Sequence, residues 1–349
     1  MELDKDGLPT GRKKSRQGRI WIGVAVTAAT IWYAGRGIPF SSVLDSIRGA
    51  DFWSLLLLSV PFYIWSNVIR ALRWRHLIKP VAKIERPMLY RATAVGFMVN
   101  NLLPLRVGEL ARSWMLHREG EVPLSAVIGT VALERVLDAV TVLGLALGSL
   151  ALVEEQSDLG GILQRGSKLL LPAALLPIVG ILVMRAAPEF VIRTSRRLLR
   201  PLSTPLQEKV ESALRGFILG LAALSGGKHL FWIGLHSLVL WLVAATAPFL
   251  LGFWAFGVDL GSFWESLLSA WVLLGAVGVA VALPSAPGFI GPYQLAFKAV
   301  LVQFGIDPAT ALAMGILVWF VFWLSMTLQG VVALRYSRVR LSELLGSRR

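Results

Sequence analysis

The chain is built from apolar runs separated by short polar connections. Six of these runs contain between 15 and 30 residues. A helix needs roughly 20 residues to cross a hydrocarbon layer about 30 Å thick. The pattern therefore predicts an all-α polytopic membrane protein with about six full transmembrane helices. The predicted spans are 20–34, 52–69, 124–153, 169–184, 230–256 and 308–334.

Two further apolar stretches are interrupted before they could cross. Residues 92–105 form a run of 14 residues that carries Asn100, Asn101 and Pro104 and leads into the charged segment 106–118. This run is too short to span, so it predicts a re-entrant helical hairpin at about 88–118. The stretch 266–306 is broken by PSAPGFIGP, whose prolines and glycines stop a continuous helix. It predicts a second re-entrant hairpin, although two full crossings would return the chain to the same face.

The basic residues lie where the positive-inside rule expects cytoplasmic segments. The net charge is +14, and the lysines and arginines cluster in the connections and tails. This distribution predicts cytoplasmic tails at 1–19 and 335–349 around one transmembrane domain, 20–334, in the inner (plasma) membrane. Because span 52–69 ends before them, Arg70 and Arg73 fall in a connection predicted to be cytoplasmic.

The second large basic region, 186–228, also shows helical periodicity. Leu206, Val210, Leu214, Phe217 and Leu221 recur at intervals of three and four residues. We therefore expect an amphipathic segment on the inner interface, where its basic residues would contact anionic lipid. The clustering explains the net charge without a nucleic-acid partner.

The order of spans and broken hairpins occurs twice. A span, a hairpin and a span follow one another in 52–153 and again in 230–334, in opposite orientation. Inverted repeats with discontinuous helices are typical of transporters, because alternating access uses two halves related by an axis in the membrane plane.

Charged residues gather at the first hairpin and in the following span. Glu134 and Asp138 lie roughly 15 and 21 Å along a helix that begins at residue 124, near the middle of a bilayer. They share one helix face, and Arg135 is close enough to pair with Asp138. The hairpin adds Arg106, Glu109 and Arg112 at intervals of three, so three acids face three bases.

This cluster has two interpretations. A balanced set of charges could lock the hairpin to the span. Alternatively, Arg106 and Arg112 bind a phosphate or another anionic head group, and the carboxylates orient them.

The two breaks supply further candidate ligands. Asn100 and Asn101 could donate hydrogen bonds at the first hairpin tip, or they could cap the helix at the break. In the second hairpin Gly288 and Gly291 would expose backbone amides to an anion, with Gln294 nearby, or the segment is a plain helix break. We therefore take these five residues as candidate substrate ligands together with the six charged ones.

The residues that would support other chemistries are missing from the sequence. There are no cysteines, and the four histidines show no ligand spacing. No glycine loop for a nucleotide and no Ser/His/Asp arrangement is recognisable. We expect no catalytic residue, no metal and no cofactor.

Three motifs resemble the lysylphosphatidylglycerol synthase transmembrane family, also described as flippase-like or UPF0104. The first is N-x-L-P-x-R-x-G-E-x-x-R within NNLLPLRVGELAR, and the second is E-R-x-x-D at Glu134, Arg135 and Asp138. The third, P-x-x-P-G-G-x-G-x-x-E, is matched in part, since Phe289 stands at the second glycine and Gln294 at the acid. The resemblance covers nearly the whole chain.

The resemblance implies a membrane domain with two re-entrant hairpins that flips an aminoacylated phospholipid made by a separate cytoplasmic domain. This chain ends 15 residues after its last predicted span, so we expect a stand-alone flippase-like protein. Other relatives are linked to polyprenyl-phosphate sugars or hopanoids, so the lipid partner is either a phospholipid or a polyprenyl- or hopanoid-type lipid.

Three functional hypotheses follow. The first is a lipid translocase that moves an amphiphile with a charged or glycosylated head group between leaflets through a polar cavity. The second is a membrane enzyme acting on a lipid phosphate or polyprenyl-linked sugar, with Glu134 or Asp138 as base. The third is an accessory subunit with structural charges. Energy source, direction and oligomeric state, a homo-oligomer included, stay open.

Overall fold

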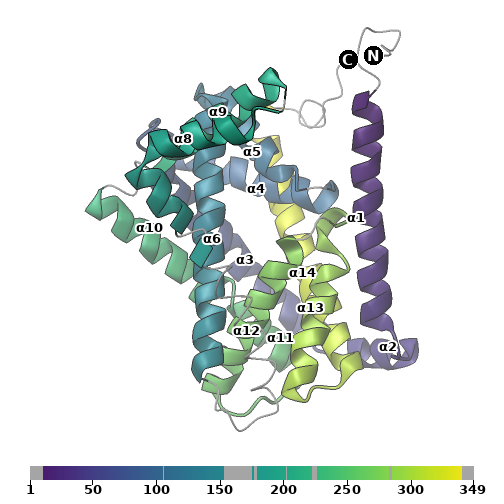
Figure 1. Cartoon of the computed structure of the whole chain (residues 1–349). Helices are drawn as coiled ribbons and strands as arrows, with labels where there is room; N and C mark the ends of the chain where they lie inside the picture. Colours follow the sequence, from purple (N-terminus) through teal and green to yellow (C-terminus); the bar gives the residue numbers. More distant parts are fainter. Residues whose placement is uncertain are drawn as a thin grey trace.

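The computed structural model describes residues 11–104, 106–152, 175–176, 179–201, 203–221, 226–282 and 285–339. Every regular element within these ranges is a helix (Figure 1), in agreement with the predicted all-α class. The helices are α1 Gly11–Gly35, α2 Phe40–Gly49, α3 Phe52–Ile78, α4 Arg86–Leu102, α5 Gly108–Gly120, α6 Leu124–Leu152, α8 Pro188–Leu198, α9 Thr204–Leu221, α10 Gly227–Val239, α11 Ala247–Ala255, α12 Phe263–Ala282, α13 Pro292–Leu301 and α14 Pro308–Arg335.

Four helical units in the described part of the chain are long and apolar enough to cross a membrane. They are α3, the unit Gly227–Ala255, α12 and α14. In the second of these, the π-helical turn Leu240–Ala244 joins α10 to α11. Helix α6 has 29 residues and is therefore about 43 Å long, but it carries the predicted charges. Half of the predicted span 169–184 lies outside the described residues.

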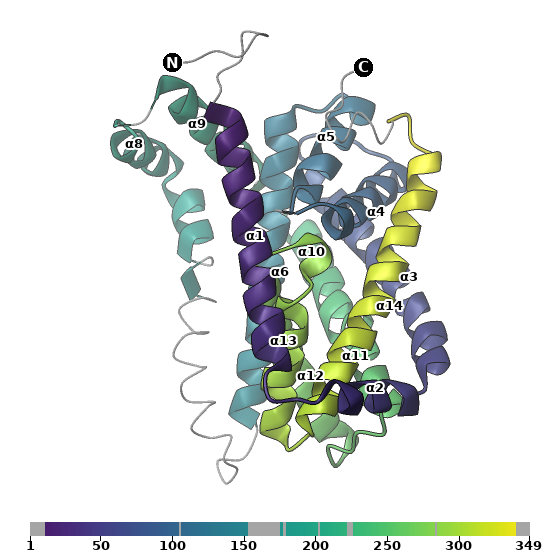
Figure 2. The ribbon, with the colours of Figure 1, turned by 90° about the vertical axis from the view of Figure 1, so that its right-hand side faces the viewer.

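The two broken pairs of helices lie in opposite halves of the molecule. Helices α4 and α5 lie in the upper half of Figures 1 and 2, near the start of α1 and the end of α14, whereas α12 and α13 lie in the lower half. The break Pro287–Phe289 packs against α4. The two breaks therefore meet in the interior, between the two ends of the bundle.

Helix α14 fastens both breaks. The indole Nε1 of Trp319 donates to the carbonyl of Gly288 at 2.6 Å, and that of Trp323 donates to the carbonyl of Asn101 at 3.2 Å. The Asn101 amide donates in return to the carbonyl of Trp323 at 3.1 Å and to the hydroxyl of Thr327 at 3.0 Å. Because a helix break leaves backbone groups without partners, these bonds are what allows the chain to turn inside the bundle.

One helix was not predicted. The connection between the predicted spans 20–34 and 52–69 contains α2. Its buried Val43 packs against Ala309 and Ala313 of α14, so a short helix buries an apolar side that a loop would leave open. The Asp51 carboxylate then caps α3 by accepting from the amide of Ser54 at 3.1 Å.

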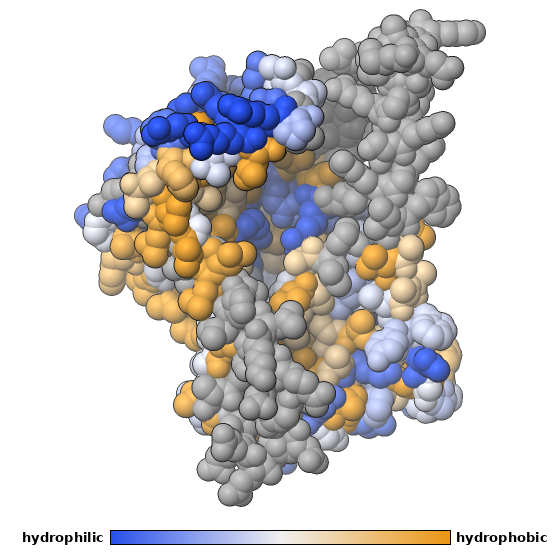
Figure 3. Space-filling model, viewed as in Figure 1, coloured by the Kyte–Doolittle hydropathy of each residue, from blue (hydrophilic) through white to orange (hydrophobic). Residues whose placement is uncertain are grey.

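The predicted amphipathic segment forms two helices, α8 and α9. Helix α9 packs directly on α6, because Gly129 and Gly216 let the two backbones approach; a Cβ at Gly129 would lie 2.1 Å from the Gly216 carbonyl oxygen. The apolar side chains Phe217 and Leu221 are buried in this region. The apolar stripe of α9 is therefore used at least partly for protein packing, and hydrophilic residues cover the outer surface over α8 (Figure 3).

Candidate functional site

The site is built on the middle of α6, where Glu134 and Asp138 are both buried. Arg135, on the same helix, pairs with both carboxylates, and its Nη2 lies 3.0 Å from Asp138 Oδ2. The spacing therefore places the two acids and the base together as predicted. Buried carboxylates are tolerated only when cations and donors surround them, and here three other helices supply those groups.

Helix α5 supplies Arg112, which is almost completely buried. Its Nη1 and Nη2 atoms lie 3.2 Å from Glu134 Oε1, and Nη1 lies 3.3 Å from Oε2. The guanidinium also stacks over the ring of Trp74, 4.9 Å from its centroid. These bonds tie the first broken pair to α6, as the locking interpretation requires of Arg112.

Helix α3 supplies two arginines that the sequence analysis placed wrongly. The apolar run suggested a span ending near residue 69, with Arg70 and Arg73 in a cytoplasmic connection; instead α3 continues to Ile78 and both arginines are buried. Arg73 Nη2 lies 2.7 Å from Asp138 Oδ1 and 3.6 Å from Glu134 Oε1, while Arg70 Nη1 lies 3.6 Å from Asp138 Oδ2. The two arginines are buried because they neutralise the acids of α6.

Two unpredicted polar side chains of the α10–α11 unit complete the ring of partners. Ser237 accepts from Arg73 Nη1 at 3.0 Å, and Trp241 Nε1 donates to Asp138 Oδ1 at 2.9 Å. The Trp241 ring also lies beneath Arg70, 5.1 Å from its guanidinium carbon. In the sequence these residues look like ordinary members of an apolar span.

The charges in this region do not balance. With the two arginines of α3 there are five cations around three acids, and with every group ionised the excess is two positive charges. The predicted equality of three acids and three bases is therefore wrong. The cations are Arg70, Arg73, Arg106, Arg112 and Arg135, and the acids are Glu109, Glu134 and Asp138.

Arg106 differs from the other arginines of this cluster. It lies in the break between α4 and α5, with a positive φ of 53°. Among the described residues it has no salt bridge and no hydrogen bond, and its Nε is buried without a partner. Its guanidinium instead lies over the ring of Phe289 from the other break, 5.2 Å from the centroid. A half-buried cation with no carboxylate within salt-bridge distance among the described residues is suited to bind an anion.

The other residues of the first break have different roles. Asn100 Oδ1 accepts from the Gly108 amide at 2.7 Å, and its amide donates to Glu109 Oε2 at 3.3 Å. Asn100 thus closes the turn, and both Asn100 and Glu109 also line the central cavity. Asn101 points to α14 through the bonds described above and lies outside the cavity lining.

The predicted ligands of the second break do not line the central cavity. The amide of Gly291 donates to Gln294 Oε1 at 2.7 Å, so it is used within the turn. A Cβ at Gly288 would lie 2.9 Å from Trp323, and one at Gly291 would lie 2.4 Å from the hydroxyl of Thr30. These glycines therefore serve close packing at a sharp turn, and it is their neighbour Phe289 that faces the cavity.

A cavity of about 170 Å³ lies between the two breaks and the cluster. Its lining combines the polar residues Arg70, Arg106, Arg135, Glu109 and Asn100 with apolar and aromatic ones. Figure 3 shows a hollow on one face of the molecule with hydrophilic side chains at its floor, between α6 and α1. The cavity thus offers cations among apolar and aromatic side chains, which fits an amphiphile.

Comparisons with known proteins agree with this architecture. A family model described as the lysylphosphatidylglycerol synthase TM region matches residues 20–330. Glycosyltransferase AglD of Haloferax volcanii is 26% identical over 332 residues, which cover 87% of this chain and 52% of that protein. The chain thus spans about half the length of that relative.

A second relative has a similar length. A UPF0104 membrane protein of Methanothermobacter thermautotrophicus is 24% identical over 345 residues, covering 93% of this chain and 96% of that protein. No solved structure matches the chain. Since the family model covers most of the sequence, the chain belongs to the lysylphosphatidylglycerol synthase TM region family, whose members are membrane proteins.

Proposed function

We propose that this protein is a lipid translocase that moves an amphiphile with a phosphate-containing head group between leaflets through the central cavity. The observation that carries the proposal is Arg106, a cation with no salt bridge or hydrogen bond among the described residues, at the point where the two broken helix pairs meet. The surrounding cluster already has an excess of positive charge, so an anionic head group would lower its electrostatic free energy.

Three cations that line the cavity have an unused donor. The Nε atoms of Arg70, Arg106 and Arg135 are buried without hydrogen-bond partners among the described residues. Arginine binds phosphate through two parallel N–H donors, and such charge-assisted bonds are roughly twice as strong as neutral ones. The aromatic and aliphatic side chains of the lining, which include Phe249 and Leu274, would contact the apolar part of the lipid.

We infer that both broken pairs are re-entrant hairpins entering from opposite faces. At 1.5 Å per residue, α4 is about 26 Å long, α5 about 20 Å and α13 about 15 Å, all shorter than a hydrocarbon core of about 30 Å. Helix α12 alone has the length to cross. Two hairpins from opposite faces that touch at their tips resemble the discontinuous helices of transporters, which bind substrate near the midplane.

The orientation follows from charge. The end of the bundle that contains α8 also contains the start of α1 and the end of α14, and it is rich in arginine. By the positive-inside rule we assign this end to the cytoplasmic face of the inner membrane, and the exposed arginines of α8 would contact anionic lipid there.

We propose that the remaining predicted ligands, Asn100 and Glu109, orient the cations around the head group.

A second function is favoured by one observation, the name of the relative glycosyltransferase AglD. Our second candidate is therefore a membrane enzyme that acts on a lipid-linked sugar, with a carboxylate of α6 as base. The matched part covers only about half of that relative, so its activity belongs first to the whole of that protein.

The test is reconstitution into liposomes that contain phosphatidylglycerol with a fluorescent acyl chain. A membrane-impermeant reductant bleaches the outer leaflet, and translocation exposes the inner pool. We expect the bleached fraction of the fluorescence to exceed the fraction of labelled lipid that starts in the outer leaflet. The mass of the lipid should stay unchanged. Arg106→Gln should slow movement by about tenfold to a hundredfold, because a charge-assisted hydrogen bond contributes about 1.5–3 kcal/mol.

Arg75→Gln is the matched control, since Arg75 is exposed on α3 and outside the cavity lining. Arg106 suits this test better than Arg112, because its removal breaks no described ion pair. Normal transport by the Arg106 variant would refute the site. A lipid of changed mass would support the enzyme instead, and neither movement nor product would support a structural role for the charges.

A further inference from the structure

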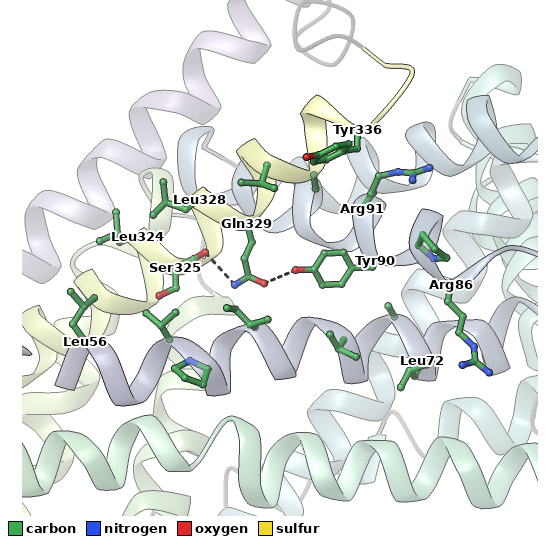
Figure 4. A pocket seen from close by; sticks show the side chains of 18 of the residues that line it. Leu56, Leu72, Arg86, Tyr90, Arg91, Leu324, Ser325, Leu328, Gln329 and Tyr336 are labelled. Carbon is green, nitrogen blue, oxygen red and sulfur yellow. Dashed lines mark hydrogen bonds between the residues drawn. The ribbon is translucent and has the colours of Figure 1, made fainter. Parts of the chain in front are cut away.

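A second, larger cavity lies on the other side of the contact between α3 and α14. It has a volume of about 1060 Å³ and is lined mainly by apolar side chains of these two helices, with the start of α4 at one end (Figure 4). This groove shares none of its lining residues with the central cavity. It is therefore a separate binding surface that the proposed function does not use.

Two stripes form the walls, one on α3 and one on α14. Residues on a helix that are four apart lie on one face. The stripe of α3 runs for about 24 Å and that of α14 for about 18 Å, at 1.5 Å per residue. The hydrocarbon of one leaflet is about 15 Å thick, so the stripes are long enough for an acyl chain. Their members are Leu56, Val60, Ile64, Val68 and Leu72 on α3 and Leu324, Leu328, Val332 and Tyr336 on α14.

The polar side chains inside the groove satisfy one another. Gln329 Oε1 accepts from Tyr90 Oη at 3.2 Å and from Asn67 Nδ2 at 3.0 Å, and Gln329 Nε2 donates to the carbonyl of Ser325 at 3.2 Å. Figure 4 shows Tyr90 and Gln329 pointing toward each other across the middle of the groove. Because these groups are paired, a hydrocarbon chain could pass them without leaving a polar atom unsatisfied.

Positive charge is confined to one end of the groove. Arg86 and Arg91 of α4 both line it there, while Leu56 and Leu324 lie at the other end (Figure 4). Arg91 Nη2 lies 3.5 Å from Glu119 Oε2, and its Nε is buried without a hydrogen-bond partner. Arg86 has no ion pair or hydrogen bond within the described residues. The lining of the groove thus carries two cations and no acid at this end.

We propose that this groove binds one anionic phospholipid. Its phosphate would lie between Arg86 and Arg91, and an acyl chain would lie along the stripes of α3 and α14. A zwitterionic lipid has the same chains but carries its own ammonium group, which the two arginines would repel. The groove thus has positive charge at one end and apolar walls along its length. This arrangement matches a lipid in the leaflet that lies on the α8 side of the bundle.

The experiment is native mass spectrometry of the full chain in detergent, titrated with phosphatidylglycerol or phosphatidylcholine. We expect one phosphatidylglycerol to be retained at least tenfold more tightly than phosphatidylcholine. The variant Arg86→Gln/Arg91→Gln should lose this preference. The control Arg75→Gln/Arg193→Gln removes the same charge from exposed positions outside the groove and should keep it.

A second pair of variants tests the apolar walls. Val332→Trp fills the groove and should weaken retention about tenfold, whereas Val331→Trp changes an exposed neighbour outside the lining and should not. All six substituted positions are at least partly exposed. An unchanged melting temperature verifies that each variant folds.

Several results would overturn the proposal. Equal retention of both lipids would mean that the bound lipid is non-specific boundary lipid. An equal loss of retention in the variants and in their controls would mean the same. Tighter binding of a polyprenyl phosphate than of phosphatidylglycerol would assign the groove to another occupant. If Arg106→Gln removed the lipid and the groove variants did not, the lipid would occupy the central cavity, whereas retention in Arg106→Gln supports two independent sites.

Discussion

Replacing Glu134 should strongly lower the free energy of unfolding. Its side chain is completely buried and contacts Arg112, Arg73 and Arg135. Glu134→Gln keeps the volume but removes the negative charge, so Arg112 and Arg73 lose a shared counter-ion and the local excess rises from two positive charges to three. Breaking a buried ion pair by removing one partner costs about 3–5 kcal/mol. We therefore expect a destabilisation of this size.

The assay is reversible unfolding in mixed micelles, followed by the loss of helical signal. A cost of about 3–5 kcal/mol corresponds to a change in the folding equilibrium of about a hundredfold to a few thousandfold. Glu208→Gln is the control, because Glu208 is exposed on α9, and it should shift the free energy of unfolding by less than about 0.5 kcal/mol.

A double substitution separates the ion pair from simple loss of packing. Replacing Glu134 and Arg112 together by Leu and Met removes both buried charges, so the double variant should be more stable than the sum of the single effects implies. The reasoning fails if Glu134→Gln costs under about 1 kcal/mol, because a carboxylate with these partners would then contribute no more than an exposed one.

Three further predictions concern the breaks and the basic surface. Gly291→Ala should destabilise the fold by about 1–3 kcal/mol or more, since Gly291 has a φ of 95° and no space for a Cβ. Phe289→Gly should relieve strain at a φ of 63° yet weaken anion binding, because the ring beneath Arg106 is lost. Two arginines, Arg196 and Arg215, lower the pKa of the partly exposed Glu211 from 4.5 to about 2, and Arg196→Gln should raise that pKa toward 4.5 in a carbon NMR titration.

A control for Gly291→Ala is also in the chain. Gly305→Ala places a Cβ at a φ of 79° with no atom within 4 Å. Its effect on the free energy of unfolding should therefore come from backbone strain alone, without a steric clash. Equal costs at both glycines would mean that the close packing at Gly291 is unimportant. The lowered pKa of Glu211 means that its ion pairs stabilise α8 and α9 above about pH 4.5 and lose this effect as pH falls toward 2. A Glu211 midpoint near 4.5 in the unmodified protein would contradict the pairing.

Hydropathy was sufficient to predict the long helices and the two breaks, because apolar runs and prolines act locally. It failed at the end of α3, since Arg70 and Arg73 lower the mean hydropathy as strongly as residues of an aqueous connection would. A signal was nevertheless present. No proline or glycine interrupts 69–78, and Leu77 and Ile78 resume the apolar pattern, so the helix had no reason to stop. Arg70 and Arg73 are three apart and face the acids, whereas Arg75 points outward.

The candidate site was predicted less completely than the fold. The spacing of Glu134, Arg135 and Asp138 on one helix brought them together, because that relation is local. The partners from α3 and from the α10–α11 unit depend on tertiary packing, which the sequence does not reveal. The amide of Gly291 looked available because the sequence could not show that Gln294, three residues later, turns back to accept its hydrogen bond.

The contact between Arg106 and Phe289 explains why the two breaks differ from simple glycine turns. Both residues have a positive φ, which costs a residue other than glycine roughly 1–3 kcal/mol. The motif that the second break resembles has glycine where this chain has Phe289, and a φ of 63° is the conformation that glycine adopts without strain. Here the chain retains the conformation and adds an aromatic ring, which lies under the Arg106 guanidinium of the opposite break. An anion bound to Arg106 would therefore bind at a contact between the two breaks. We expect binding or release of the anion to change this contact between Arg106 and Phe289.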